Sequence, residues 1–146
     1  MTKSGSFWDG VEGRTPMPPA ARTLGFELID AHPAAGTITV QFQGTAAFTN
    51  PFGQVLGGFL AAMLYDTLGP ALLATLPAGW FIETLDLHCF FVAPARPGRF
   101  VGRGRVISRD GDLATLDGTL MDHTGTVVAT ATASAKVVPL DDGPAR

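Results

Sequence analysis

One segment, residues 57–76, limits the folds open to this chain more than any other. It is rich in Leu, Ala and Met, it lacks a single apolar stripe, and Asp66 is its only charged residue. A helix that is apolar on all sides must be surrounded by protein or by lipid. A helix of about 20 residues is roughly 30 Å long, so its covering must be of similar length.

Lipid is excluded first, although the nearly uncharged run from residue 56 to residue 82 is long enough to cross a bilayer. Asp66 lies inside the run, Gly69-Pro70 and Pro77-Ala78-Gly79 interrupt it, and no Lys or Arg flanks it closely. Membrane spans tolerate an internal carboxylate poorly and usually carry basic residues near an end. We therefore expect a helix buried in protein, and no membrane association.

Strand patterns lie on both sides of this helix. Alternating apolar and polar residues, clearest near the C-terminus, predict strands over residues 26–30, 37–43, 80–92, 98–108, 112–121 and 126–138. Gly-containing turns such as Asp110-Gly111 separate the later strands, and residues 16–22 are compatible with a short helix. The order is therefore two strands, one long helix and four more strands.

A sheet is the only partner large enough to cover such a helix. The sequence therefore predicts an α+β hotdog fold, in which an antiparallel sheet of about six strands wraps around one long central helix. A β-sandwich is the alternative, and it would leave the helix uncovered. We expect residues 1–14 to form an N-terminal tail or lid, residues 15–138 a single hotdog domain and residues 139–146 a C-terminal tail.

Composition narrows the function. Charged residues make up only 16% of the 146 residues, against about 25% in an average soluble chain, which favours a buried subunit interface. The net charge of −3 and the scattered arginines give no basic face for nucleic acid. One Cys and three scattered His make no metal site, and no cofactor-binding loop is present. The single Cys and the lack of an apolar signal core favour the cytoplasm.

Three features near the helix could carry chemistry. Gly57-Gly58 at the helix start offers free backbone N–H groups, either as an oxyanion hole or simply for close packing. Asn50 precedes the helix in a short Pro/Gly loop, where its amide either orients a water or caps the turn. Asp66 lies in apolar packing, and a carboxylate there must be paired, hydrogen-bonded or functional.

The spacing between these features matters. Gly57 and Asp66 are nine residues apart, which is about 13 Å along a helix and about 180° around it. One subunit cannot direct both groups at one carbonyl. If both act, the site combines the helix start of one subunit with Asp66 of another, and a catalytic homodimer follows.

The pattern Asn50…Gly53…Leu56-Gly57-Gly58…Asp66, with Pro94-Ala95 closing the strand after the helix, resembles the hotdog acyl-CoA thioesterases of the phenylacetate-pathway type. The resemblance covers residues 15–138. It implies hydrolysis of an acyl-CoA thioester to free acid and thiol, without a cofactor. It also implies a homodimer, arranged as a dimer of dimers (a homotetramer), in which residues 83–92 pair with their own copy.

The same resemblance implies residue roles. The N–H of Gly57 would polarise the thioester carbonyl, and Asn50 would help to place the nucleophilic water. Asp66 would act as base or nucleophile from the neighbouring subunit, assisted by the hydroxyl of Thr84.

The sequence departs from the family pattern at two positions. Leu56 stands where many members have histidine, and Tyr65 stands where the family's acid usually lies, one position before Asp66. One residue turns a side chain by about 100° around a helix. We expect Leu56, Gly58 and Tyr65 to line the substrate site. The alternative function is a non-catalytic protein that binds acyl-CoA or an aromatic ligand and has lost the usual acid.

The arginines of one strand form a further candidate site. Arg99, Arg103 and Arg105 share one face by a period of two, which suits either coenzyme A phosphates or a solvated surface. We assign Arg103 and Arg105 to substrate binding.

The strand after the helix carries the last candidates. The same period places Asp86 and His88 on the face of Thr84, where they could form the acid/base pair of a hydratase. Cys89 is expected on the face opposite His88, as a buried thiol.

Overall fold

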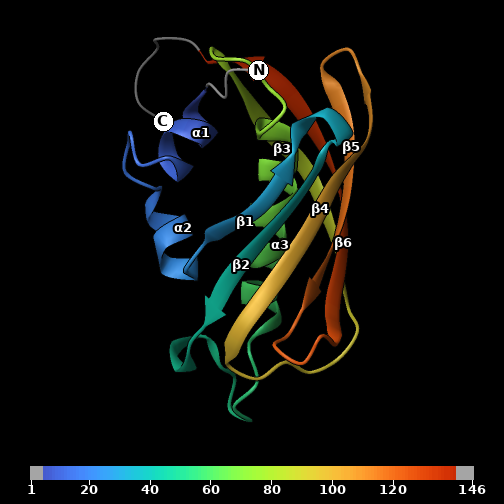
Figure 1. Ribbon diagram of the computed structural model, residues 1–146. Helices are drawn as coiled ribbons and strands as arrows, with labels where there is room; N and C mark the ends of the chain where they lie inside the picture. Colours follow the sequence, from blue (N-terminus) through green and yellow to red (C-terminus); the bar gives the residue numbers. More distant parts are fainter. Residues whose placement is uncertain (1–4, 141–146) are drawn as a thin grey trace.

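The computed structural model describes residues 5–140 and shows one antiparallel sheet curved around a long helix (Figure 1). The sheet order is β1-β2-β4-β5-β6-β3. The elements are α1 (Ser6–Val11), α2 (Pro19–Leu24), β1 (Glu27–His32), β2 (Thr37–Gly44), α3 (Gly57–Leu73), β3 (Trp80–Phe91), β4 (Gly98–Asp110), β5 (Leu113–Met121) and β6 (Val127–Pro139). The predicted α+β hotdog fold is confirmed. No helix within residues 5–140 is long and apolar enough to span a membrane.

Helix α3 lies unusually close to the sheet because the strands facing it carry glycines. A Cβ atom added to Gly102 of β4 would collide with the side chain of Thr67, and one added to Gly104 would lie 3.0 Å from the Thr67 carbonyl oxygen. Thr67 is fully buried, and its hydroxyl donates to the carbonyl of Met63 at 2.8 Å. The close approach buries the middle of α3 and fixes its position against the sheet.

A β-bulge changes which residues of β3 face the helix. The pairing of β3 with β6 shifts register between Thr84 and Asp86, so one extra residue reverses the alternation beyond that point. Leu87 and Cys89 pack against the core, whereas Asp86 and His88 are exposed on the outer face. The prediction that Asp86 and His88 share the face of Thr84 is wrong for this reason. The expected placement of Cys89 opposite His88 is confirmed.

The N-terminal segment is folded onto the domain. Residues 6–11, predicted to belong to a tail or lid, form helix α1 at the end of α3 (Figure 1). Trp8 is 3% exposed, and its indole Nε1 donates to the carbonyl of Ala74 at 3.2 Å. The ring of Phe7 packs edge-to-face against Trp8. Residues 1–4, and residues 141–146 of the predicted C-terminal tail, lie outside the described residues.

Candidate active site

Asp66 lies in the second half of α3 and lines an apolar cavity of about 350 Å³. Its Oδ2 atom is buried and has no hydrogen-bond partner among residues 5–140. Burial raises the pKa of this carboxyl from its ordinary 3.8 to about 6. An unpaired carboxylate in apolar surroundings destabilises the folded state, so its presence in a cavity makes Asp66 a candidate functional residue.

The helix presents one continuous face to this cavity. Tyr65, Asp66, Gly69, Pro70 and Leu73 all line it, as expected for residues three, four, seven and eight positions apart on a helix. Tyr65 and Asp66 therefore border the same space. The one-residue departure from the family pattern does not remove Asp66 from the cavity.

Thr84 reaches the same cavity from β3. It precedes the bulge, so its side chain is on the inner face together with Ile82. The structure thus brings together three predicted site residues, Asp66, Tyr65 and Thr84. They make up what we call the acid half-site.

A second cavity, of about 360 Å³, lies at the start of α3 and is bordered by Asn50, Gln54, Gly57 and residues 91–95. Gly57 is the first residue of the helix, so its N–H has no acceptor within the helix. The ring of Phe91 packs against Gly57, since a Cβ atom added to Gly57 would lie 3.1 Å from that ring.

Asn50 holds the loop that leads into the helix. Its Oδ1 accepts hydrogen bonds from the backbone N–H groups of Phe52 at 2.9 Å and Gln54 at 3.0 Å. Its Nδ2 donates a long hydrogen bond of 3.5 Å to the Gln54 side-chain oxygen, and Asn50 lines the cavity. The turn-capping role is therefore present in this residue, together with a donor that could orient water. Asn50 and Gly57 make up the donor half-site.

The two half-sites share no lining residue. Gly57 and Asp66 lie at separate cavities, as their nine-residue spacing predicts. Leu56 is 49% exposed and Gly58 is also exposed, and neither lines either cavity. Their substrate-contact role stays a prediction.

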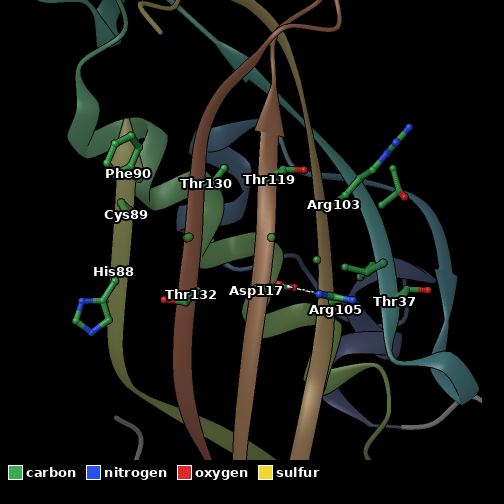
Figure 2. Close-up of a pocket in the computed structure, with 15 residues that line it drawn as sticks. Thr37, His88, Cys89, Phe90, Arg103, Arg105, Asp117, Thr119, Thr130 and Thr132 are labelled. Atoms are coloured by element: carbon green, nitrogen blue, oxygen red, sulfur yellow. Dashed lines mark hydrogen bonds and ion pairs between the residues drawn. The ribbon is translucent and has the colours of Figure 1, made fainter. Parts of the chain in front are cut away.

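Arg103 and Arg105 lie on the outer face of the sheet, remote from both half-sites. Because Gly102 and Gly104 face the helix, the alternating arginines point the other way. Figure 2 shows this face, where Arg105 pairs with Asp117 of the neighbouring strand through contacts of 2.7 and 3.1 Å. The structure therefore does not bring these two arginines together with the other predicted site residues.

Sequence reasoning missed the N-terminal wall of the acid half-site. Phe7 and Gly10 of α1, and Met17 in the segment that follows, line the cavity beside Asp66. The available signal was the pair Phe7 and Trp8, the only large aromatic residues in an otherwise polar and glycine-containing start of the chain.

Comparison with known proteins gave no match among protein-family models or curated protein sequences. Among solved structures, the chain is similar to a phenylacetic acid degradation-related protein of Ralstonia eutropha JMP134 that is assigned as a thioesterase. The two share 38% sequence identity with a TM-score of 0.86, over 89% of this chain and 98% of that chain.

Two further structures support the fold alone. A thioesterase of Haemophilus influenzae is 17% identical, with a TM-score of 0.80 over 97% of each chain. The PaaI protein of the E. coli phenylacetic acid degradation operon is 17% identical, with a TM-score of 0.77 over 90% of this chain and 93% of that chain. With the fold, the half-sites and the 38% identity in agreement, this chain belongs to the hotdog-fold thioesterases of the phenylacetic acid degradation type.

Proposed function

We propose that this protein hydrolyses an acyl-CoA or related thioester to free acid and thiol, in a site shared between two subunits. One observation carries the proposal. Asp66, whose buried Oδ2 has no hydrogen-bond partner among residues 5–140, lines a cavity beside the second half of α3, and a helix-start donor lines a separate cavity at the beginning of α3. Hydrolysis of a thioester needs both an acceptor for the proton of water and a donor for the developing oxyanion.

The edge strand β3 supports a second copy of the chain as the missing partner. Within residues 5–140, β3 pairs only with β6 and lies at the edge of the sheet. It exposes an unusual number of large apolar side chains, namely Trp80, Phe81, Leu85, Phe90, Phe91 and the adjacent Val92. A long apolar edge left unpaired would promote aggregation, whereas antiparallel pairing with its own copy would cover it.

Such pairing would also join the half-sites. If residues 83–92 pair antiparallel with their own copy about a two-fold axis, the Thr84 end of one strand lies beside the Phe91 end of the other. Thr84 belongs to the acid half-site, and Phe91 covers Gly57 of the donor half-site. The dimer would therefore contain two complete sites, each with Asp66 from one subunit and Gly57 from the other. A dimer of dimers and a cytoplasmic location stay predictions.

In the proposed mechanism, the thioester carbonyl oxygen accepts a hydrogen bond from the N–H of Gly57 at the positive end of the α3 dipole. Asn50 Nδ2 orients a water, and Asp66 takes its proton as the oxygen attacks the carbonyl carbon. The tetrahedral intermediate collapses, the C–S bond breaks, and the coenzyme A thiolate leaves and is protonated. Thr84 assists Asp66 from the same cavity.

Attack by Asp66 itself, through a mixed anhydride that water then hydrolyses, is equally compatible with this geometry. A non-catalytic binding protein is not favoured, because the chain retains a carboxylate in the cavity and belongs to a family of thioesterases.

The test is the kcat of wild type and Asp66→Asn on a panel of aliphatic and aromatic acyl-CoA thioesters. The substitution keeps the shape and removes the ability to accept a proton, so kcat should fall by roughly 10²–10⁴-fold. Asp110→Asn, at the exposed end of β4, is the matched control and should retain wild-type kcat. An unchanged kcat in Asp66→Asn would falsify the catalytic assignment.

A further inference from the structure

We infer that Phe7 of α1 forms the end wall of the acyl pocket and sets the largest acyl group that the enzyme accepts. The inference rests on the proposed function, which places the thioester beside Asp66. It concerns the segment before residue 15, which lies outside the part of the chain that resembles the family by motif.

The cavity of the acid half-site is elongated along α3. Asp66 and Leu73 both line it, and seven residues of helix correspond to about 10 Å. Asp66 and Thr84 provide the polar groups near one end. Phe7 lines the cavity together with Leu73 and Phe81, so an acyl chain that extends from a carbonyl beside Asp66 along the helix meets α1.

Helix α1 is fixed at this position rather than resting loosely on the surface. The indole of Trp8 donates to the carbonyl of Ala74, which caps the end of α3. Ala74 and Trp8 are both buried. The ring centroids of Phe7 and Trp8 are 5.2 Å apart at an interplanar angle of 79°, so the buried indole supports the Phe7 ring from behind.

The volume of this cavity limits the size of the acyl group. The cavity holds about 350 Å³, and an apolar cavity of about 150 Å³ accommodates a benzene ring. A ring with a short linker, or a short aliphatic chain, fits between Asp66 and Phe7. A long fatty acyl chain would have to displace α1 and break the contact of Trp8 with Ala74.

Two substitutions in α1 change this wall in opposite directions. Phe7→Ala shortens the wall and leaves the Trp8 anchor in place. Gly10→Leu adds bulk, because a Cβ atom at Gly10 already lies 3.1 Å from Met17 Sδ, the flexible end of a side chain that can move aside. Val11→Ala is the matched control, since Val11 belongs to the same helix and does not line this cavity.

The experiment measures kcat/KM for butanoyl-, octanoyl-, palmitoyl- and phenylacetyl-CoA with wild type and the three variants. In parallel, calorimetry measures Kd for S-alkyl-CoA thioethers of matching length, which cannot be hydrolysed. Phe7→Ala should raise the palmitoyl-to-butanoyl ratio of kcat/KM by about tenfold or more, Gly10→Leu should lower the octanoyl-to-butanoyl ratio, and Val11→Ala should leave both ratios unchanged.

The two readouts separate this inference from the proposed function. If no thioester is hydrolysed but the thioether Kd values shift with Phe7→Ala and Gly10→Leu as described, the hydrolase proposal fails and the wall assignment stands. If hydrolysis proceeds and neither α1 variant changes the length profile, while thermal melting shows both to be folded, the wall assignment is overturned. The same conclusion follows if the thioether Kd values do not depend on residue 7 or residue 10.

Discussion

The start and the second half of α3 carry different chemical groups. At the start of the helix the proposed functional groups are the backbone N–H of Gly57 and the side-chain N–H of Asn50, and both are donors. In the second half the proposed functional group is the carboxylate of Asp66, an acceptor, in a cavity walled mostly by apolar side chains. Neither region alone supplies both groups that the proposed thioester hydrolysis needs. The unpaired edge of β3 is the place where the start of one α3 and the second half of the other subunit's α3 would meet.

The largest effect is expected from separating the subunits. In the double variant Leu85→Glu/Phe90→Glu, the new carboxylates of the two subunits would come close together, because the proposed antiparallel pairing brings the residue 85 end of one β3 beside the residue 90 end of the other. We expect monomers in sedimentation and a loss of kcat of about 10³-fold, since both ends of α3 lose their counterpart. Both positions are exposed in the single chain, so the fold should persist.

The control places the same charges on exposed apolar residues away from β3, as Ile107→Glu/Leu113→Glu. This variant should sediment as wild type and keep its activity. A well-folded, fully active monomer of the β3 variant would contradict the division of the site between subunits.

The acceptor end should also be visible in stability without any substrate. The folded-state pKa of Asp66, about 6, lies above its ordinary value of 3.8. The raised pKa therefore contributes stability below about pH 4 that is lost as the pH rises through about 6. Asp66→Asn should remove this loss and be more stable than wild type at pH 8, by about 3 kcal/mol in the free energy of unfolding.

Urea unfolding of both proteins from pH 4 to pH 8 measures this difference. Asp110→Asn should retain the wild-type pH dependence. A wild-type free energy of unfolding that rises over this range, relative to Asp66→Asn, would show that the carboxylate is paired rather than isolated.

One added methyl group should have different effects on activity at the two glycines that begin α3. A Cβ atom at Gly57 would press on the ring of Phe91, whereas one at Gly58 meets nothing within 4 Å. Gly57→Ala should therefore lower kcat/KM by about tenfold through displacement of the carbonyl, and Gly58→Ala should lower it by less than Gly57→Ala does. Equal effects at the two positions would argue against Gly57 as the oxyanion donor.

Much of this architecture could be predicted from the sequence, because buried faces of helices and strands produce regular patterns of apolar residues. The helix that is apolar on all sides predicted a covering sheet, and the six alternating segments predicted the strands of that sheet. The structure has both the helix and the sheet. The bulge between Thr84 and Asp86 could not be predicted by counting a constant period of two, because the register shift that marks it appears only in the pairing of β3 with β6. Period counting therefore misplaced Asp86 and His88.

The candidate site was predictable in its residues and less so in its surroundings. The positions of Gly57 and Asp66 on one helix fix their separation, because helix geometry is regular. Helix α1 has only six residues, too few to show a helical period, and it is held by long-range contacts such as Trp8 with Ala74. The position of Phe7 beside the cavity depends on those contacts, so the aromatic pair Phe7 and Trp8 was the only local sign of it.

The most direct test of the shared site mixes two variants that are each defective at a different end of α3. Asp66→Asn removes the acceptor. Asn50→Asp keeps the Oδ1 atom that holds the loop and removes the amide donor. Each homodimer should have little activity. After co-refolding in equal amounts, about half of the dimers carry one subunit of each kind, and each of these contains one intact site and one doubly defective site.

With a shared site, thioesterase activity of the mixture should return to about one quarter of the wild-type value. Mixing either variant with itself should restore nothing. If the mixture shows only the average of the two homodimers, while native mass spectrometry confirms that mixed dimers have formed, Asp66 and Asn50 act within one subunit and the shared site is contradicted.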